Sequence, residues 1–308
     1  MSSPENHAGF NITKTVLQVA ETGYDGDVFK LLNLNEAKFD QPLNFNTDKD
    51  AIITARLQTA FDAINLKNPI TSKAASFTLP LETFLTFQVP FENSLLYSDQ
   101  LEEFRWELSV LYPHIPADEL VIQYFEIEKN MVITKNTALV LAFPRRFINL
   151  LNKFCSSNNL VLKFVDHPHL AADLAINFSS ESDTKGLSLS VYISKKNFSL
   201  LFILDDRPVY IRVFPFQEFS DIIKILTDHL NPSVNKNINK DLLTNAYVCG
   251  EDVPDELISY LKNTLKINFK KFNPFSKIKP GAGMAENIYF RQNFNSFAPA
   301  AGISYRVA

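Results

Sequence analysis

Two adjacent lysines are the residues whose type and position best fit contact with a phosphate group. Lys195 and Lys196 lie in the short polar connection Ser194–Asn197, between two apolar segments that each read as a β-strand. A lysine ammonium in such a turn neutralises an anion. Gly23 and Gly26 lie in a second turn, and glycine lets backbone N–H groups approach a ligand closely. Together they allow phosphate binding but form no established motif.

Other residue types that carry chemistry occur without a recognisable pattern. Asp166-His167-Pro168-His169 resembles a cluster of metal ligands, but no CxxC or HExxH accompanies it. We interpret it as a connection between a strand and a helix, capped at the helix N-terminus. Gly281-Ala282-Gly283 follows Pro280 without a strand-to-helix cradle, so we interpret it as a flexible loop. No GxSxG nucleophile motif is present. We predict no catalytic and no metal-binding residue.

The composition limits the classes of function. The net charge of −4 gives no positive footprint for nucleic acid. The 308 residues include 8 glycines, where about 7% is ordinary, and 27 phenylalanines. The chain therefore packs a core well but is poorly equipped to cradle a nucleotide. Cys155 and Cys249, in apolar surroundings, are predicted to be reduced thiols of a cytoplasmic protein.

Membrane association is predicted through partners only. No apolar run approaches the ~20 residues that span a bilayer, and the N-terminus has no signal-peptide pattern. The lysine-rich segment 262–279 alternates with Phe269, Phe272 and Phe275. An anionic membrane surface is one reading of this segment, and a solvated strand face is the reading that we prefer.

The order of predicted elements indicates an α/β fold. Residues 1–13 are expected to be frayed, followed by a strand at 14–20, a turn at 21–27 and a strand at 28–34. Helices are expected at 50–66, with Ile53, Leu57, Ala60, Phe61 and Ile64 inward, and at 98–112, with Leu101, Phe104, Leu108 and Leu111 inward and Trp106 outside. The meander at 187–216 resembles the hairpin at 14–34, as one unit used twice.

That order of elements resembles the PilM family of type IV pilus assembly proteins, which have an actin-like ATPase fold. The resemblance covers about 14–307. The segment 77–125 is similar to the family's strand–strand–helix–strand insert, and 137–166 to its strand–helix–strand that leads to a Val-Asp. Asn273-Pro274-Phe275 is similar to its closing Asn-Pro-Phe, and 297–307 to its C-terminal helix.

The sequence departs from this family where nucleotide chemistry would occur. The family's first strand runs into an Asp and then a Gly, for which the best match here is Gln18 and Ala20. The second phosphate strand has Tyr192 and Ser194 at those places, followed by Lys195 and Lys196. An Asp orients the water shell of Mg²⁺, which Gln cannot do.

The family's late glycine cluster, on the adenosine side, is reduced here to Gly250, followed by Glu251 and Asp252, which would repel an anion. By resemblance, Lys195, Lys196 and Gly250 are the candidate nucleotide contacts. We expect no bound cofactor; Mg²⁺ and ATP held by these three residues are the alternative.

The resemblance also implies a division into domains. We expect a duplicated, RNase H-like architecture of two lobes with a PilM-type insert. Residues 1–82 and 163–184 would form the first lobe and 83–162 the insert, with the order strand–helix–strand–strand–helix. Residues 185–308 would form the second lobe, with a C-terminal helix that returns to the first.

The function implied by the resemblance is a non-catalytic cytoplasmic scaffold at the bacterial inner membrane. It would bind the cytoplasmic N-terminal segment of a PilN-like membrane protein and contact pilus motor or platform components, and it is a possible homo-oligomer. The alternatives are an active actin-like ATPase that switches between open and closed lobes, and a scaffold of type II secretion.

Overall fold

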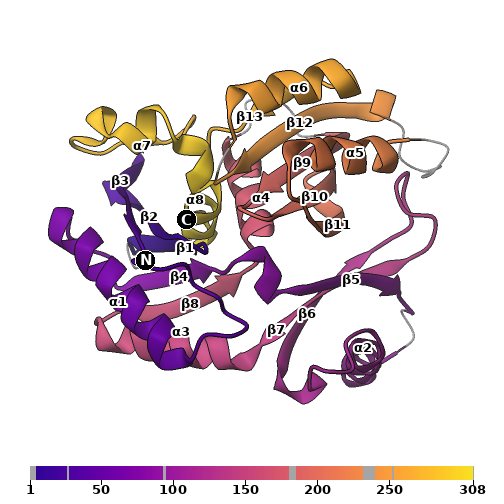
Figure 1. Ribbon diagram of the computed structural model, residues 1–308, viewed down its shortest axis with the longest axis horizontal. Helices are drawn as coiled ribbons and strands as arrows, with labels where there is room; N and C mark the ends of the chain where they lie inside the picture. The colour runs from indigo at the N-terminus through magenta and orange to yellow at the C-terminus, as the bar shows by residue number, and fades with distance from the viewer. Residues whose placement is uncertain are drawn as a thin grey trace.

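Three β-sheets, covered by helices, make up the computed structural model, which describes residues 5–25, 28–92, 95–179, 185–231, 240–251 and 253–307. Figure 1 shows one lobe around β1 to β4 and β8, a second lobe around β9 to β13, and a smaller layer formed by β5 to β7 with one helix. The two lobes meet along the C-terminal helix α8.

The first sheet has six strands and joins the two ends of the chain. Its strands, in spatial order, are β14 (Lys279–Pro280), β3 (Val28–Lys38), β2 (Val16–Asp25), β1 (His7–Ile12), β4 (Ala74–Thr78) and β8 (Val161–Asp166). The meander β1-β2-β3 is antiparallel, and β4 and β8 continue the sheet in parallel beside β1.

The second sheet repeats this order with five strands. They are, in spatial order, β11 (Arg207–Pro215), β10 (Asn197–Leu204), β9 (Leu187–Ile193), β12 (Leu243–Gly250) and β13 (Phe269–Lys271). The meander β9-β10-β11 is antiparallel, and β12 and β13 run parallel to β9. By topology β9 therefore corresponds to β1, which confirms the predicted use of one unit twice.

The predicted fraying of residues 1–13 is wrong for its described part. Strand β1 is buried along its whole length because its polar side chains are hydrogen-bonded. The His7 ring donates from Nδ1 to the Ser304 carbonyl oxygen (2.9 Å) and accepts at Nε2 from the Ser76 hydroxyl (2.8 Å). Between these polar residues Ala8, Phe10 and Ile12 alternate, and they are fully buried.

The predicted turn at 21–27 is also largely strand. Strand β2 continues to Asp25, so Gly23 lies inside it and packs against the Asn6 side chain. Gly26, the other glycine proposed for a phosphate loop, lies outside the described residues. This end of β2 is the opposite one from the β1–β2 turn, so Gly23 does not face the turn that corresponds to Ser194–Asn197.

The helices predicted at 50–66 and 98–112 are present within one residue of these bounds, and further helices cover the sheets. The helices are α1 (Asp50–Lys67), α2 (Tyr97–Leu111), α3 (Arg145–Ser157), α4 (Pro168–Ser179), α5 (Phe219–His229), α6 (Asp255–Leu265), α7 (Ile288–Arg291) and α8 (Ala298–Ser304). Short 3₁₀ turns occur at Leu81–Thr83, Ala117–Glu119, Lys240–Leu242, Met284–Glu286, Phe294–Phe297 and Tyr305–Val307. All five residues predicted inward on α1 are buried. On α2, Leu111 is instead 50% exposed, because the helix ends there, and Trp106 is 62% exposed, as predicted.

The third sheet contains β5 (Leu85–Pro90), β7 (Thr137–Pro144) and β6 (Leu120–Ile127), with α2 on one face. Strand β7 is buried on both faces. Ala138, Val140 and Ala142 pack under α2, while Leu139 and Leu141 pack into the core of the second lobe. The small layer is thus joined to the second lobe by apolar contact.

Two segments near the predicted domain limits pack with the first lobe. Helix α3 falls within the predicted insert, but its residues Phe147, Leu151 and Phe154 belong to the apolar cluster of β1 and β4. By packing, the insert is therefore the part from β5 to β7. Helix α8 lies against β1, β2, β4 and α4.

Glycines allow the close approach of α8. A Cβ on Gly9 would lie 2.1 Å from the Ala300 carbonyl oxygen, and one on Gly302 would lie 1.7 Å from the Ala171 carbonyl oxygen. Both distances are far below van der Waals contact. The backbones of β1, α8 and α4 therefore touch without intervening side chains, which places α8 between the two lobes.

Candidate functional site

The turns after β1 and β9 lie at one cleft between the lobes. A cavity of 460 Å³ opens there. Its walls come from both lobes and from the segment before α8: Thr15, Val16, Gln18, Glu36, Lys38, Lys195, Glu251, Val253, Pro254, Lys271, Asn293, Asn295 and Ser296. Because β1 and β9 correspond, this is the place where the duplicated fold brings its two hairpin turns together.

Asn11 and Tyr192 lie at equivalent positions of the corresponding strands β1 and β9, and their side chains are neighbours. Asn11 is fully buried, donates to Gln18 Oε1 (2.9 Å) and accepts from the Thr78 hydroxyl (2.7 Å). Tyr192 is 2% exposed, and burial raises the pKa of its hydroxyl well above the usual range. Both are buried and neither lines the cavity, although Gln18, which accepts from Asn11, does. Two neutral side chains thus hold the strand positions at which a Mg²⁺ site would need carboxylates.

The turn between β1 and β2 satisfies its own backbone donors. The Thr13 hydroxyl accepts from the amides of Thr15 and Val16 (3.1 Å each), and the Thr13 amide donates to the Val16 carbonyl oxygen (3.0 Å). In the second turn, the Ser194 amide donates to the Asn197 carbonyl oxygen (2.8 Å). A phosphate loop instead directs such N–H groups at its ligand.

The side chain of Glu251 lies in the cleft beside Lys195, where a bound phosphate would otherwise lie. Burial raises the pKa of Glu251 to about 7, against the opposing effects of Lys195, of a hydrogen bond with Thr13 and of Lys14. Glu82 adds a second carboxylate nearby and forms an ion pair with Lys14 (2.9 Å). The lysines of both turns therefore already face protein carboxylates.

The three candidate nucleotide contacts have different positions. Lys195 lines the cavity, whereas Lys196 is exposed and is absent from its walls. Gly250 ends β12 with a φ of +134°, and a Cβ there would lie 2.0 Å from the Ile193 carbonyl oxygen. The close pairing of β12 with β9 therefore explains why position 250 is a glycine. Asp252 lies outside the described residues.

Asn11 is the residue that the sequence comparison missed. Gln18, which had been matched to the first Asp, lies on β2, opposite Asn11 in the register of the hairpin. The alternation of His7, Gly9 and Asn11 with Ala8, Phe10 and Ile12 is a strand signal that identifies β1 from the sequence.

The segment Asp166–His169 is a strand-to-helix connection, as predicted. The His169 amide donates to Nδ1 of His167 (3.3 Å), which caps α4. Each ring nitrogen of His169 is hydrogen-bonded to a serine, Ser199 (2.8 Å) and Ser190 (2.9 Å). Within the described part of the chain, no group of His, Cys, Asp and Glu side chains is arranged to hold a metal ion.

Both cysteines are free and buried, and burial raises the pKa of the Cys155 thiol to about 12. Phe269, Phe272 and Phe275 are buried, while Lys262, Lys266 and Lys270 face solvent. The lysine-rich segment is therefore a solvated face over a phenylalanine core.

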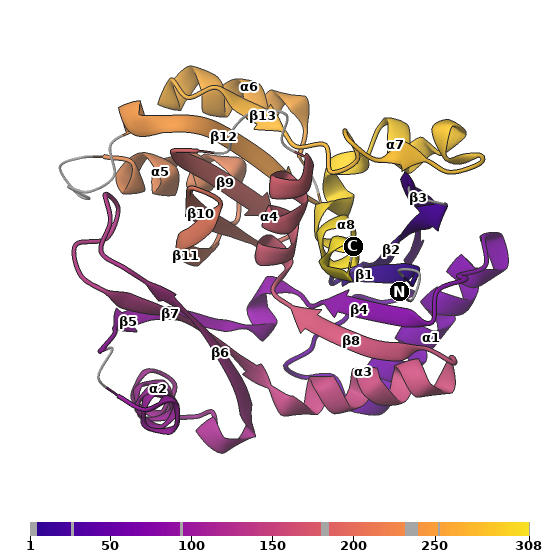
Figure 2. The same cartoon turned by 180° about the vertical axis from the view of Figure 1, so that it is seen from behind.

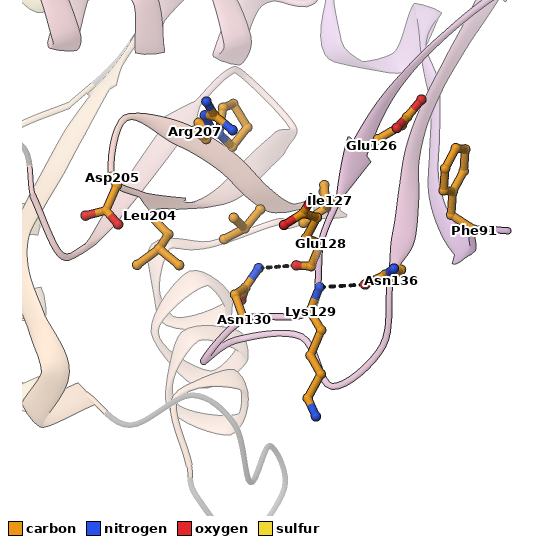
Figure 3. Close-up of a pocket in the computed structure, with 12 residues that line it drawn as sticks. Phe91, Glu126, Ile127, Glu128, Lys129, Asn130, Asn136, Leu204, Asp205 and Arg207 are labelled. Carbon is orange, nitrogen blue, oxygen red and sulfur yellow. Dashed lines mark hydrogen bonds between the residues drawn. The ribbon is translucent and has the colours of Figure 1, made fainter. Parts of the chain in front are cut away.

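A second cavity, of 620 Å³, lies between the small layer and the second lobe. Figure 3 shows its walls: the end of β6 and the connection after it, from Glu126 to Asn130, face the β10–β11 turn with Asp205 and Arg207. The Asn130 side chain donates to the Glu128 carbonyl oxygen (2.9 Å), and the Lys129 amide donates to Asn136 Oδ1 (2.9 Å). Lys129 extends away from the other groups, so the charges do not converge on one point.

No family model and no curated protein matches the sequence. Solved structures do match. A chain of a PilM–PilN type IV pilus biogenesis complex aligns over 98% of both chains with a TM-score of 0.67 and 17% identity. A Bacteroides thetaiotaomicron protein of unknown function with an actin-like ATPase fold covers 87% of this chain and 91% of its own, with a TM-score of 0.54 and 13% identity.

The chain has the actin-like ATPase fold. At these identities the matches establish the architecture, and they confirm the predicted two-lobed α/β class with an insert between strands of the first lobe. Among the described residues, no helix combines the length and the apolar content needed to cross a bilayer.

Proposed function

We propose that this protein is a non-catalytic scaffold of a type IV pilus or related assembly platform. It acts in the cytoplasm, is peripheral to the inner membrane, and binds the cytoplasmic N-terminal segment of a PilN-like membrane protein. The observation that carries the proposal is the pair Asn11 and Tyr192, two buried neutral side chains at the equivalent strand positions where a metal site would need carboxylates. The alignment with a chain of a PilM–PilN complex over almost its full length supports the type of partner.

We assign the partner segment to a groove between two strand edges. Strand β5 is the outer strand of the third sheet and β11 that of the second, and the two lie side by side. Gln88 on β5 bridges them by donating to the Val209 carbonyl oxygen (3.2 Å). An extended peptide binds such strand edges through its backbone and places alternate side chains in pockets.

The groove has an apolar wall and an unused polar group. A cavity of 490 Å³ lies between Phe84–Gln88 and Tyr210–Val213, with Leu111 and Tyr112 at its border. In the part of the chain that the structure describes, the buried Thr86 hydroxyl has no hydrogen-bond partner. The mixed lining, with Gln88 and Arg212 beside the apolar side chains, fits an extended segment whose backbone bonds the strand edges and whose alternate side chains are apolar.

The test is titration of a synthetic N-terminal peptide of a PilN-like protein into the full chain by calorimetry. Leu111→Asp should weaken binding at least ~10-fold, since a carboxylate in an apolar contact costs more than about 1.4 kcal/mol. Leu66→Asp is the matched control, because Leu66 is 88% exposed on α1. Absence of binding by the unmodified chain, or equal affinities of the two variants, would refute the groove.

The second candidate function is an ATPase that switches between open and closed lobes. The lysines of both turns, Lys14 and Lys195, favour it, because both lie near the cleft. Thermal unfolding with Mg²⁺–ATP, with Mg²⁺–ADP and without nucleotide separates the two. A ligand at ~100 times its dissociation constant stabilises by about 2.7 kcal/mol. The scaffold proposal expects no shift at millimolar nucleotide, and a clear shift would favour the ATPase.

A further inference from the structure

Two helices that cover the outer face of the first sheet leave a groove open between them. Helices α1 and α3 lie on the side of this sheet opposite α8, away from the second lobe (Figures 1 and 2). A cavity of 570 Å³ lies between them, and its walls in the described part of the chain come from these two helices. These walls share no residue with the cleft or with the groove at β5 and β11, so this groove is a separate feature.

Small side chains on α1 create the groove. Ala51 and Ala55, one turn apart, are exposed, whereas Leu150 and Phe154 of α3 are buried in the facing wall. Because an alanine side chain is a single methyl group, the surface of α1 is low along this stripe. The longer polar side chains at the border add their methylene groups, so the surface that the groove presents is more apolar than polar.

The wall residues recur at the spacing of a helix face. On α3 they extend from Arg146 to Ser157, which is about three turns or ~16 Å. A helix laid into such a groove contacts it through its side chains at i, i+3, i+4 and i+7. The groove therefore has the length and shape for one helix of about 11 residues.

The α3 side of the groove is positively charged. Arg145 and Arg146 lie in the first turn of α3 and Lys153 further along, and this helix contains no Asp or Glu. The positive end of a helix dipole disfavours cations, so two arginines there do not serve the stability of the helix. Among the described residues Arg145 and Lys153 form no ion pair, and both are exposed. Charges at the edge of an interface select a partner of opposite sign, so the ligand of this groove is acidic.

Helices α1 and α3 run in the same direction along the groove. Near their starts, Arg146 donates to the carbonyl oxygen of Phe45, shortly before α1. Towards their ends, the side chains of Gln58 and Asn158 exchange two hydrogen bonds (2.8 and 2.9 Å). The positive ends of both dipoles therefore lie together beside the two arginines. A third helix is favoured in the antiparallel direction, because its negative C-terminal end then meets them.

We propose that the groove between α1 and α3 binds an acidic amphipathic helix of another protein. The apolar stripe of this helix packs over Ala51, Ala55 and Leu150. Its carboxylates pair with Arg146 and Lys153, and its C-terminus lies at the start of α3. The segment assigned to β5 and β11 is extended and lies elsewhere, so the protein can hold two partners at once, and this contact stands whether or not a PilN-like peptide binds.

The probe is a fluorescent alanine-based peptide of about 15 residues, long enough to form a helix in water. It carries Leu at every third or fourth position and Glu beside each Leu. Fluorescence anisotropy with the full chain should show binding that weakens at high salt, where the Debye length is ~3 Å. A peptide with Lys in place of every Glu should not bind. If the acidic peptide fails to bind at millimolar protein, or the basic peptide binds equally well, the proposal is wrong.

Two pairs of variants locate the contact. Lys153→Glu should weaken binding about 10-fold, and Lys262→Glu, which makes the same change on the exposed face of α6, should not. Ala55→Tyr should abolish binding because the larger side chain fills the groove. Ala63→Tyr is its control, since Ala63 is exposed on the same helix but outside the groove. Equal losses within either pair would overturn the proposal.

Photo-crosslinking from either end of the peptide determines its direction. A crosslinker at the C-terminus should label the start of α3, and one at the N-terminus should label residues near Ser157, as identified by mass spectrometry. The opposite pattern would refute the assigned direction. An excess of PilN-like peptide should leave the affinity for the acidic helix unchanged, and competition between the two would show that they share one site and overturn the proposal. Circular dichroism verifies that each variant is folded.

Discussion

The two lobes repeat one order of strands, yet the inner strand of each is covered in a different way. Gly9 lies two residues before Asn11 on β1, and Ser190 lies two residues before Tyr192 on β9. At Gly9 the backbone of α8 lies so close that a Cβ would be 2.1 Å from Ala300. At Ser190 a hydroxyl meets His169 of α4 at 2.9 Å.

The difference shows that corresponding strands of one architecture can be packed against their covering helix by different kinds of contact. In the first lobe, contact by close approach leaves no room for any side chain, so α8 has a single position. In the second lobe, a hydrogen bond between side chains fills the same place, and burial keeps His169 neutral by lowering its pKa well below the usual value. The first contact is steric and the second is polar, so substitutions should affect them unequally.

The largest effect is expected for Gly9→Ala. The added methyl group meets backbone atoms of two α8 residues, Ala300 and Ser304, so it should lower the free energy of unfolding by about 3 kcal/mol in urea denaturation. Gly283→Ala is the control, because Gly283 has a φ of +75° but nothing within 4 Å of an added Cβ; it should cost about 1 kcal/mol. An equal cost at both positions would contradict the close packing of α8.

Ser190→Ala should have an intermediate effect. It leaves one ring nitrogen of the fully buried His169 without its partner, which costs about 2 kcal/mol. Ser199→Ala removes the bond at the other ring nitrogen and should cost a similar amount. Should Ser190→Ala lower the unfolding free energy as much as Gly9→Ala, the distinction between steric and polar contact would fail.

The pH dependence tests the cleft itself. The folded pKa of Glu251, about 7, is raised above the ordinary value of about 4.3. Between these values the folded state binds more protons than the unfolded state, so stability falls as pH rises. Glu251→Gln should remove the contribution of Glu251 to this decrease in the free energy of unfolding. We expect this contribution to be only about 1 kcal/mol, because Lys195 and the open side of the cleft screen the charge.

Asp173→Asn is the comparison for Glu251→Gln, because burial also raises the pKa of Asp173 to about 7. Each variant should flatten the stability profile between about pH 4 and 7 on its own, as measured by urea denaturation at several pH values. A profile of Glu251→Gln parallel to that of the unmodified chain would show that Glu251 titrates normally.

The smallest effect is expected for Gln88→Ala, which removes the hydrogen bond from β5 to β11. A partly buried bond of this type contributes about 1 kcal/mol. The apolar contacts of Leu139 and Leu141 remain, so chemical denaturation should still show a single transition. Two separate transitions would mean that the small layer unfolds independently of the second lobe.

Local patterns predicted most of the fold. The five inward residues of α1, the exposed Trp106 and the meander from β9 to β11 all follow from apolar spacing. The N-terminal strand was not predicted, because the polar residues His7 and Asn11 suggested an exposed segment. Their hydrogen-bond partners Ser304, Ser76 and Thr78 lie far away in the chain, so the local sequence does not reveal them. Such partners depend on the complete fold.

The candidate site was predicted less well for a related reason. Tyr192 lies on β9 and Ser194 directly follows it, in agreement with the strand predicted from the clear apolar pattern of this segment. On the first strand, the missed position of β1 shifted the match from Asn11 to Gln18. Gly250 illustrates another limit: its φ of +134° and its contact with Ile193 explain the residue without a ligand.

The covering of β1 by α8 has a consequence for the order of folding during synthesis. Strand β1 is translated long before the helix that buries it, which is made only at residues 298–304. Contacts of such long sequence separation form slowly, whereas the second lobe finds most of its contacts nearer in the chain. The centre of the first sheet therefore stays uncovered until α8 has been translated, which leaves apolar side chains of this sheet exposed for longer during synthesis.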